Sequence, residues 1–174
     1  MRPMKLDEID FVIDYFHCAS AEHLEMLGID PARLPDREMW RTLNVHDFSL
    51  LLPQRRSFVL LWELEGRPIG FSTVDKIKFG EHAYMHLHVV DVNLRQSGYG
   101  TSCVRKSVEI YFDLLKLERL YCEPNAFNVA PNRALQKAGF RYVKTHMTVP
   151  GPINFHQAVN RWVIERDSAD APNK

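Results

Sequence analysis

The segment HLHVVDVNLRQSGYGTS, residues 86–102, contains closely spaced glycines and histidines that could take part in chemistry. Gly98 and Gly100 stand between a β-like run and a helix-like run. A glycine-rich turn at a helix start can direct several backbone N–H groups at an anion, most often a phosphate. We predict such a site on the amides of residues 96–101, formed by Arg95, Gln96, Ser97, Gly98, Tyr99, Gly100 and Thr101. The same glycines are also typical of a simple tight turn.

Two common phosphate-binding motifs do not fit this segment. The chain has no Gly-Lys-Ser/Thr, which excludes a P-loop. The dinucleotide fingerprint requires a third glycine where Cys103 stands, and it belongs early in a doubly wound sheet rather than in mid-chain. A nucleotide-dependent oxidoreductase is therefore disfavoured.

The histidines of this region are candidates for proton transfer. Alternation along a strand places Tyr84, His86, His88 and Val90 on one face. Imidazole, with an ordinary pKa of about 6.5, suits a general base, so His86 and His88 are candidate bases. Glu81, at the start of the strand, is a third candidate and would act through water. Each histidine could instead be a packed core residue, and no further ligand at recognisable spacing supports a metal site.

Hydrophobic periodicity predicts the elements that position these residues. Residues 1–54 form a mainly helical region with helices near 6–16, 21–28 and 37–52. Three strands follow at 57–66, 69–77 and 83–92, with a hairpin turn at Glu65-Gly66. A helix at 101–117, a strand at 119–124 and a helix at 128–139 form a parallel crossover unit, and strands at 141–149 and 156–166 close the sheet. The pattern predicts one α/β domain over 1–174, with a core at 55–166 and a frayed tail at 167–174.

Composition narrows the classes of protein to which the chain could belong. Its 174 residues carry 22 basic and 22 acidic side chains, so the formal net charge is zero and nucleic acid is not the expected partner. No apolar run approaches the length of a membrane span, and the three cysteines suggest no disulfide framework. We therefore expect a cytoplasmic protein that contacts no membrane. Cys103 and Cys122 could be nucleophiles, but structural thiols are the favoured interpretation.

Two motifs resemble those of the GNAT acetyltransferases. The first, VVDVNLRQSGYGT, is similar to the family's strand, Arg/Gln-x-x-Gly-x-Gly/Ala turn and helix; the second is EPNAFNVAPNRALQKAGF. In the second, Asn128 matches the motif asparagine and Gly139-Phe140 match the terminal pair. The resemblance covers roughly residues 55–166 and is closest to the branch of ribosomal-protein alanine acetyltransferases, with a weaker likeness to siderophore-type branches.

The resemblance implies a GNAT fold, with a mixed, mostly antiparallel sheet whose strands at 83–92 and 119–124 splay apart. It also implies acetyl-CoA as the donor and direct transfer to a primary amine of a small molecule, peptide or protein N-terminus. The pantetheine arm would pair with backbone near His88 and Val90, an N–H near Val90 would polarise the thioester, and Asn128 would bind the pantetheine amides. Members are often homodimers.

The sequence departs from the family pattern at two positions. The strand at 83–92 lacks the acidic residue that often serves as the base, and Leu135 replaces the tyrosine that often protonates the leaving thiolate. These departures keep a second hypothesis open, namely a non-catalytic acyl-CoA-binding or sensor module.

Overall fold

The N-terminal third of the chain is helical in the computed structural model, which describes residues 1–94 and 98–166. Helices α1 (Ile9–His17), α2 (Ala21–Leu27) and α3 (Arg37–Ser49) follow a two-residue strand, β1 (Arg2–Pro3). Ser20 and Asp36 cap α2 and α3 by accepting hydrogen bonds from backbone N–H groups. The structure confirms the three predicted helices. Strand β1 has no sequence signal because two residues carry no periodicity.

A seven-stranded sheet forms the centre of the protein, in the order β1-β2-β3-β4-β5-β7-β6. Its remaining elements are β2 (Phe58–Leu64), β3 (Arg67–Lys78), β4 (His82–Val89), α4 (Tyr99–Leu115), β5 (Arg119–Cys122), α5 (Val129–Ala138), β6 (Arg141–Thr148) and β7 (Gln157–Glu165). Strands β4 and β5 are parallel, and the other neighbouring strands are antiparallel. The predicted mixed sheet with a central βαβ unit is confirmed. The predicted 167–174 tail lies outside the described residues.

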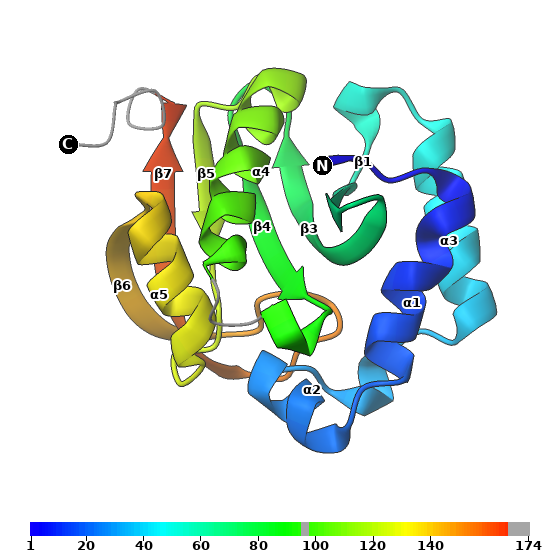
Figure 1. Cartoon of the computed structure of the whole chain (residues 1–174), viewed down its shortest axis with the longest axis horizontal. Helices are drawn as coiled ribbons and strands as arrows, with labels where there is room; N and C mark the ends of the chain where they lie inside the picture. The colour runs from blue at the N-terminus through cyan, green and yellow to red at the C-terminus, as the bar shows by residue number, and fades with distance from the viewer. Residues whose placement is uncertain (95–97, 167–174) are drawn as a thin grey trace.

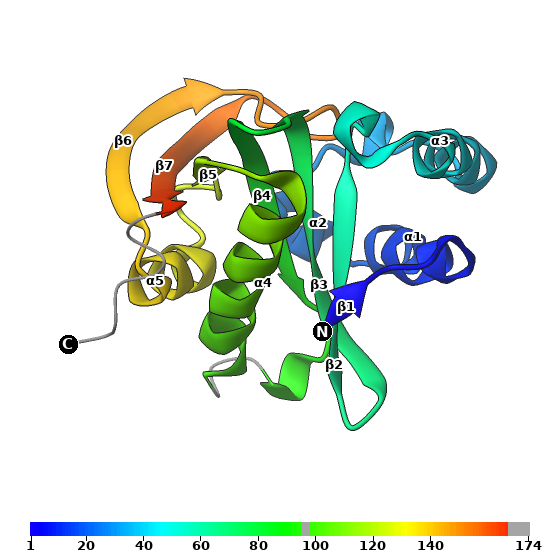
Figure 2. The same ribbon diagram turned by 90° about the horizontal axis from the view of Figure 1, so that it is seen from above.

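Helices cover the two faces of the sheet unequally. Helices α4 and α5 lie on one face, whereas α1 and α3 lie on the other, beside β2 and β3 (Figures 1 and 2). On the α4 face, Val104, Val108 and Phe112 join one buried cluster with Met85 and Leu120. On the α1 face, a second buried cluster contains Val12, Phe16, Leu61 and Phe71. We call the face that carries α1 and α3 the second face of the sheet. On this face the two helices lie over β2 and β3, and β4, β5 and β7 lie to one side of them.

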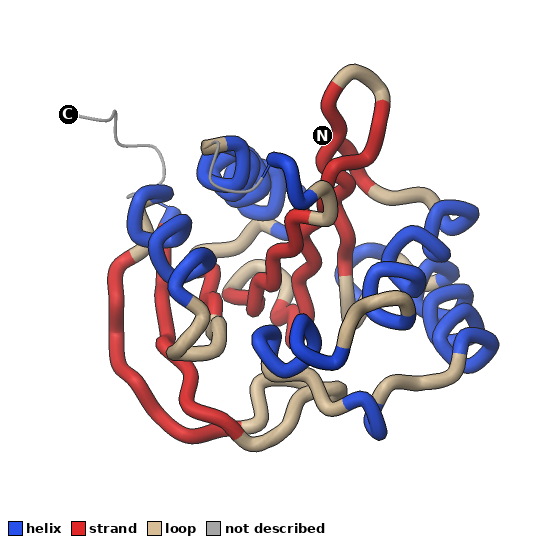
Figure 3. The backbone as a smooth tube through the Cα atoms, turned by 60° about the horizontal axis from the view of Figure 1, so that its bottom comes forward, coloured by secondary structure: helices blue, strands red, loops and turns tan. Residues whose placement is uncertain are grey.

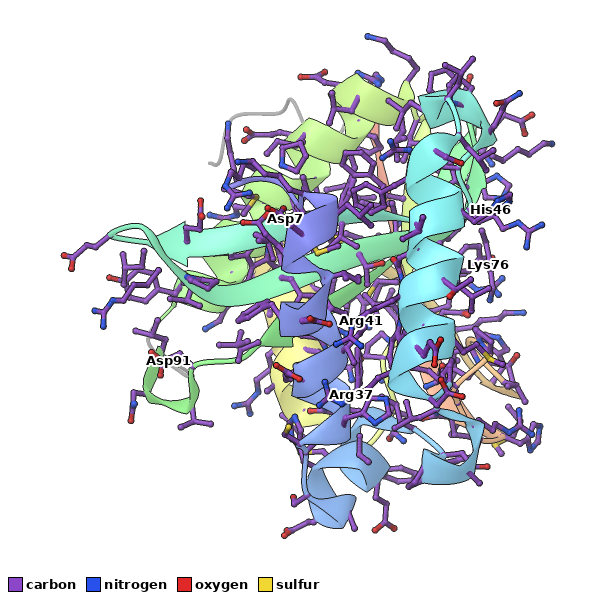
Figure 4. All side chains as sticks on the ribbon, turned by 90° about the vertical axis from the view of Figure 1, so that its right-hand side faces the viewer. Asp7, Arg37, Arg41, His46, Lys76 and Asp91 are labelled. Carbon is purple, nitrogen blue, oxygen red and sulfur yellow. The ribbon has the colours of Figure 1, made fainter. Side chains whose placement is uncertain are left out.

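Ion pairs join α3 to α1. Arg37 lies 2.6 Å from a carboxylate oxygen of Asp14, and Nε of Arg41 lies 2.8 Å from Asp10. Figure 4 shows both arginines between the two helices. The partly buried Trp40 stacks on Phe16 with a ring separation of 5.5 Å, so aromatic packing reinforces this contact.

Strands β4 and β5 stop pairing before β4 ends. The last paired residues are Met85 and Cys122, whereas β4 continues to Val89. Beyond this point the two strands diverge toward the end of the sheet that carries α2 (Figure 1). His86 and Glu123 are the first residues past the divergence, and the predicted splay is therefore present.

The segment between β6 and β7, residues 149–156, runs back across the molecule to α2 and β3 (Figure 3). The carbonyl oxygen of Gly28 accepts hydrogen bonds from the side chains of Asn154 (2.9 Å) and Gln157 (2.8 Å). Nζ of Lys76 donates to the carbonyl oxygen of Pro150. These contacts place the segment beside the second face of β3 and β4. Within the described ranges, no helix is both long and apolar enough to cross a membrane.

Candidate active site

The glycine turn leads into α4, whose first backbone N–H groups have no partner within the helix. Gly98 caps this 17-residue helix in a left-handed conformation, with φ at 90°, and the first turn of the helix contains no acidic side chain. Among the described residues, a Cβ atom placed on Gly98 would meet no atom within 4 Å, and one on Gly100 would lie 3.7 Å from a methyl carbon of Val89. The described residues therefore leave space beside the helix N-terminus, and a helix N-terminus suits a diphosphate. The predicted contacts from Arg95, Gln96 and Ser97 lie outside the described residues.

A cavity of about 660 Å³ opens between α1, α2 and the residues that follow β4. This volume is in the range of small-molecule sites. Its lining includes Phe11, Asp14, Tyr15, His23, Met26 and Val90. The side chain of Asn128, at the N-cap of α5, donates to the backbone oxygen of Met26 at 3.4 Å and makes no capping bond with its own helix. Asn128 therefore joins the start of α5 to the cavity wall.

His88 is packed among aromatic rings. Its imidazole stacks on Phe71 with a ring separation of 4.7 Å, and Nδ1 lies 3.3 Å from the hydroxyl oxygen of Tyr15. That hydroxyl lies 2.9 Å from Nε2 of His23. Burial lowers the pKa of His88 to about 3, with a further lowering from the nearby His86 and His23. His88 is therefore uncharged at neutral pH and a weak proton acceptor.

His86 has a carboxylate partner that the sequence analysis missed. Its Nε2 lies 3.2 Å from Oδ1 of Asp75 on β3, and both side chains are about one-quarter exposed. Oδ1 of Asp75 is buried and receives no well-aligned hydrogen bond within the described part of the chain, so the contact is a close polar pairing. The absence of an acidic residue from β4 is thus offset by one on the neighbouring strand. In the β3–β4 register Asp75 pairs with Tyr84, two residues before His86, and this places Asp75 near His86. The sequence alone does not specify this register.

The backbone near Val90 differs from the sequence prediction. The Val90 N–H already donates to the carbonyl oxygen of Ile69 at 2.9 Å, so it points toward β3 and not toward the divergence. N–H groups alternate in direction along a strand, which directs the amide of Leu87 to the β5 side. Leu87 is the first such residue beyond the last β4–β5 pair, and it replaces Val90 as the candidate donor.

Glu81 lies far from these groups. It forms an ion pair with Lys78 at 2.7 Å in the turn before β4. Five residues separate it from His86, and at about 3.3 Å per residue this corresponds to roughly 17 Å along the strand. The strand carries Glu81 to the opposite end of the sheet, so this geometry does not support its prediction as a base.

The remaining candidate groups agree with a structural interpretation. Leu135 is fully buried in the core, so its position provides no proton donor. Burial raises the pKa of both the Cys103 and the Cys122 thiols, which disfavours the thiolate form that a nucleophile needs. No group of three or more metal-ligating side chains occurs in the described parts of the chain.

Comparisons with known proteins agree with this fold. The model of the Acetyltransferase (GNAT) family matches residues 15–140. The chain is similar to a structure of AAC(6')-Ib in complex with ribostamycin and coenzyme A, with a TM-score of 0.73 and 18% identity over 99% of this chain and 96% of that chain. It is also similar to a single-residue mutant of spermidine N-acetyltransferase from Vibrio cholerae, with a TM-score of 0.73 and 12% identity over 97% and 94% of the two chains. No curated protein matches the sequence significantly. The likeness to the alanine acetyltransferase branch stays a prediction.

Proposed function

Because the chain belongs to the GNAT acetyltransferase family and is therefore an acetyl-CoA-dependent N-acetyltransferase, we propose that it acetylates a primary amine by direct transfer. The acceptor amine belongs to a small molecule, a peptide or a protein N-terminus. The observation that carries this proposal is the His86–Asp75 pair at the point where β4 and β5 diverge. A base at that point can accept a proton from an amine that enters from the second face of the sheet.

The donor side of the site rests on the glycine turn. The amides of Gly98, Tyr99, Gly100 and Thr101 bind the diphosphate of coenzyme A at the α4 N-terminus, where the helix dipole favours negative charge. The pantetheine arm extends beside β4 in the manner of an added strand. The Leu87 N–H then faces the arm and polarises the thioester carbonyl, as an oxyanion-hole donor does.

His86 removes the proton that the acceptor amine must lose. An ammonium group is not nucleophilic, so a base that accepts its proton lowers the barrier to attack. Asp75 lies beside the imidazole, so its negative charge is close to the positive charge that develops on the ring during transfer. The new N–C bond forms as the C–S bond breaks, and the thiolate that leaves takes up a proton. The hydroxyl of Tyr15, which lines the cavity beside Val90, is our candidate for that proton donor.

His88 is not suited to the role of base. Its lowered pKa and its packing against Phe71 and Tyr15 leave it neutral and enclosed. Its contact with Tyr15 instead orients the hydroxyl at the cavity wall. We assign His88 a positioning role and His86 the catalytic one.

Release of thiol from acetyl-CoA, measured across a panel of amines, tests the proposal. We expect turnover with at least one class among amino acids, peptides, polyamines and aminoglycosides. His86→Ala should lower kcat about 100-fold or more, in line with the usual contribution of a general base. His46→Ala, an exposed histidine on α3, is the matched control and should be unaffected. Coenzyme A binding without turnover on any amine would instead favour the non-catalytic acyl-CoA-binding module.

A further inference from the structure

A row of three ionisable residues crosses the sheet at the divergence of β4 and β5. The pairs Met85–Cys122 and Cys122–Trp162 fix the strand register, so His86, Glu123 and Arg161 follow at the next level on β4, β5 and β7. Met85, Cys122 and Trp162 belong to the buried cluster under α4 and α5. By alternation, the row of three therefore points to the opposite face, on which the acceptor is expected.

Arg161 is held in place but keeps part of its hydrogen-bonding capacity. Its Nε donates to Oε1 of Glu123 at 2.6 Å, and the Glu123 side chain is only 4% exposed. The two terminal guanidinium nitrogens donate to no residue that the structure describes, and the side chain is 27% exposed. A fixed guanidinium with free terminal N–H groups has the geometry that binds a carboxylate in bidentate fashion.

Aromatic rings and a second cation surround this guanidinium. The Arg161 guanidinium carbon lies 5.8 Å from the ring centre of Tyr84 and 5.9 Å from that of Tyr121, and these two rings stack at 5.2 Å. Nζ of Lys76 lies 4.9 Å from the centre of the Tyr84 ring. Two fixed cations thus share one aromatic platform. Two carboxylates, Glu123 and Asp75, also lie near Tyr84, so the formal charges balance. Recognition of an anion therefore rests on the terminal N–H groups of Arg161 and not on net charge.

We propose that Arg161 binds a carboxylate of the acceptor, which makes the acceptor an amino acid or peptide-like amine rather than a polycation. This inference rests on the proposed function, because it places the reactive amine at His86. Paired strands lie about 4.8 Å apart, so β4 and β7 are at least about 10 Å apart at this level, where β4 and β5 begin to diverge. His86 and Arg161 lie on the same face at the two sides of this space. A short ω-amino acid or a dipeptide spans that space.

Three acceptors of equal chain length provide the first test. The probes are 6-aminohexanoate, hexylamine and 1,6-diaminohexane, together with a dipeptide and its C-terminal amide. We expect kcat/KM to be at least tenfold higher for 6-aminohexanoate than for the other two amines, and higher for the dipeptide than for its amide. Arg161→Gln should raise KM for the two carboxylates at least tenfold, leave kcat largely unchanged, and leave the values for hexylamine unchanged.

Two further variants separate recognition from folding. Arg161→Gln combined with Glu123→Gln removes both charges of the pair, so no buried carboxylate is left alone. Its carboxylate preference should be lost as in the single variant. Arg41→Gln is the matched control, because Arg41 also pairs with a carboxylate through Nε but lies between α1 and α3. Arg41→Gln should keep the wild-type preference.

Calorimetric titration of 6-aminohexanoate and 1,6-diaminohexane into the coenzyme A complex provides a readout independent of turnover. Tighter binding of the carboxylate that disappears in Arg161→Gln supports the inference, even if no amine is acetylated and the proposed function fails. Equal binding of the two compounds, or a preference for the diamine, overturns the inference. If the diamine is acetylated efficiently, the proposed function stands and this assignment of the acceptor class falls.

Discussion

Nε2 of His86 on β4 lies 3.2 Å from Oδ1 of Asp75 on β3, immediately beyond the last pair between β4 and β5. The two residues are eleven positions apart in the sequence and belong to strands joined by a turn at Gly80. A histidine with a carboxylate partner at this point is suited to removing a proton from an acceptor amine.

Asp75→Asn should lower kcat roughly tenfold, which is less than the effect of removing His86. The asparagine keeps the size of the side chain but removes the negative charge beside the ring that accepts the proton. The KM for acetyl-CoA should not change, since Asp75 lies away from the glycine turn. Steady-state kinetics with circular-dichroism melting check both points, and a variant with unaltered kcat would remove Asp75 from the mechanism.

Gly100→Ala should weaken coenzyme A binding without weakening the fold. A Cβ at this position has room within the protein, and alanine is about 0.5–1 kcal/mol more favourable than glycine inside a helix. The same methyl group intrudes on the space directed at the diphosphate. We expect an unfolding temperature equal to or above that of the wild type, together with a Kd for coenzyme A at least tenfold higher by calorimetry. Unchanged affinity would place the diphosphate elsewhere.

Gly98→Asp should abolish coenzyme A binding outright. The left-handed conformation of Gly98 disfavours any side chain, and a carboxylate there opposes a bound diphosphate. Gly66→Asp, in the hairpin between β2 and β3, is the control with the same backbone strain and equally open surroundings. If both variants retain wild-type Kd values, the turn is not the anion site.

His88 should make the fold sensitive to acid. Its pKa is near 6.5 in the unfolded chain and about 3 in the folded one, so the folded state binds fewer protons between these values. The free energy of unfolding therefore falls as pH decreases from about 6.5 toward 3, by up to about 1.4 kcal/mol per pH unit. Urea unfolding at pH 7.5 and pH 5 should show a smaller decrease for His88→Met than for the wild type. Identical decreases would mean that another group carries the effect.

Gly28→Ala should destabilise the protein by more than about 2 kcal/mol. Gly28 has φ at 72°, and an added Cβ would lie 2.0 Å from the side-chain amide of Gln157. Gln157 would have to move and lose its hydrogen bonds to Gly28 and Asn125. Gly66→Ala shares the left-handed conformation but meets no atom, so it should cost only about 1 kcal/mol. Equal unfolding midpoints for the two variants would show that the contact with Gln157 contributes nothing.

Local features of the site follow from the sequence with few errors. Gly98 and Gly139 take the left-handed conformations that end or begin helices, and the Glu65-Gly66 turn joins β2 and β3 as predicted. His86 and His88 share a face because side chains alternate along any strand. Each of these properties depends on residues a few positions apart, so periodicity and turn preferences suffice to predict it.

The sequence by itself determined the class of fold, the glycine turn and the face on which the histidines lie. Only the tertiary structure decided which residues meet across strands. Asp75 contacts His86, and Glu123 and Arg161 lie in the same row as His86. The carbonyl oxygen of Ile69 accepts the hydrogen bond of the Val90 N–H. Glu81 lies in the turn before β4, away from the site. The physical reason is strand register: a shift of one residue changes every cross-strand neighbour, and burial across the whole sheet, rather than any local pattern, selects the register.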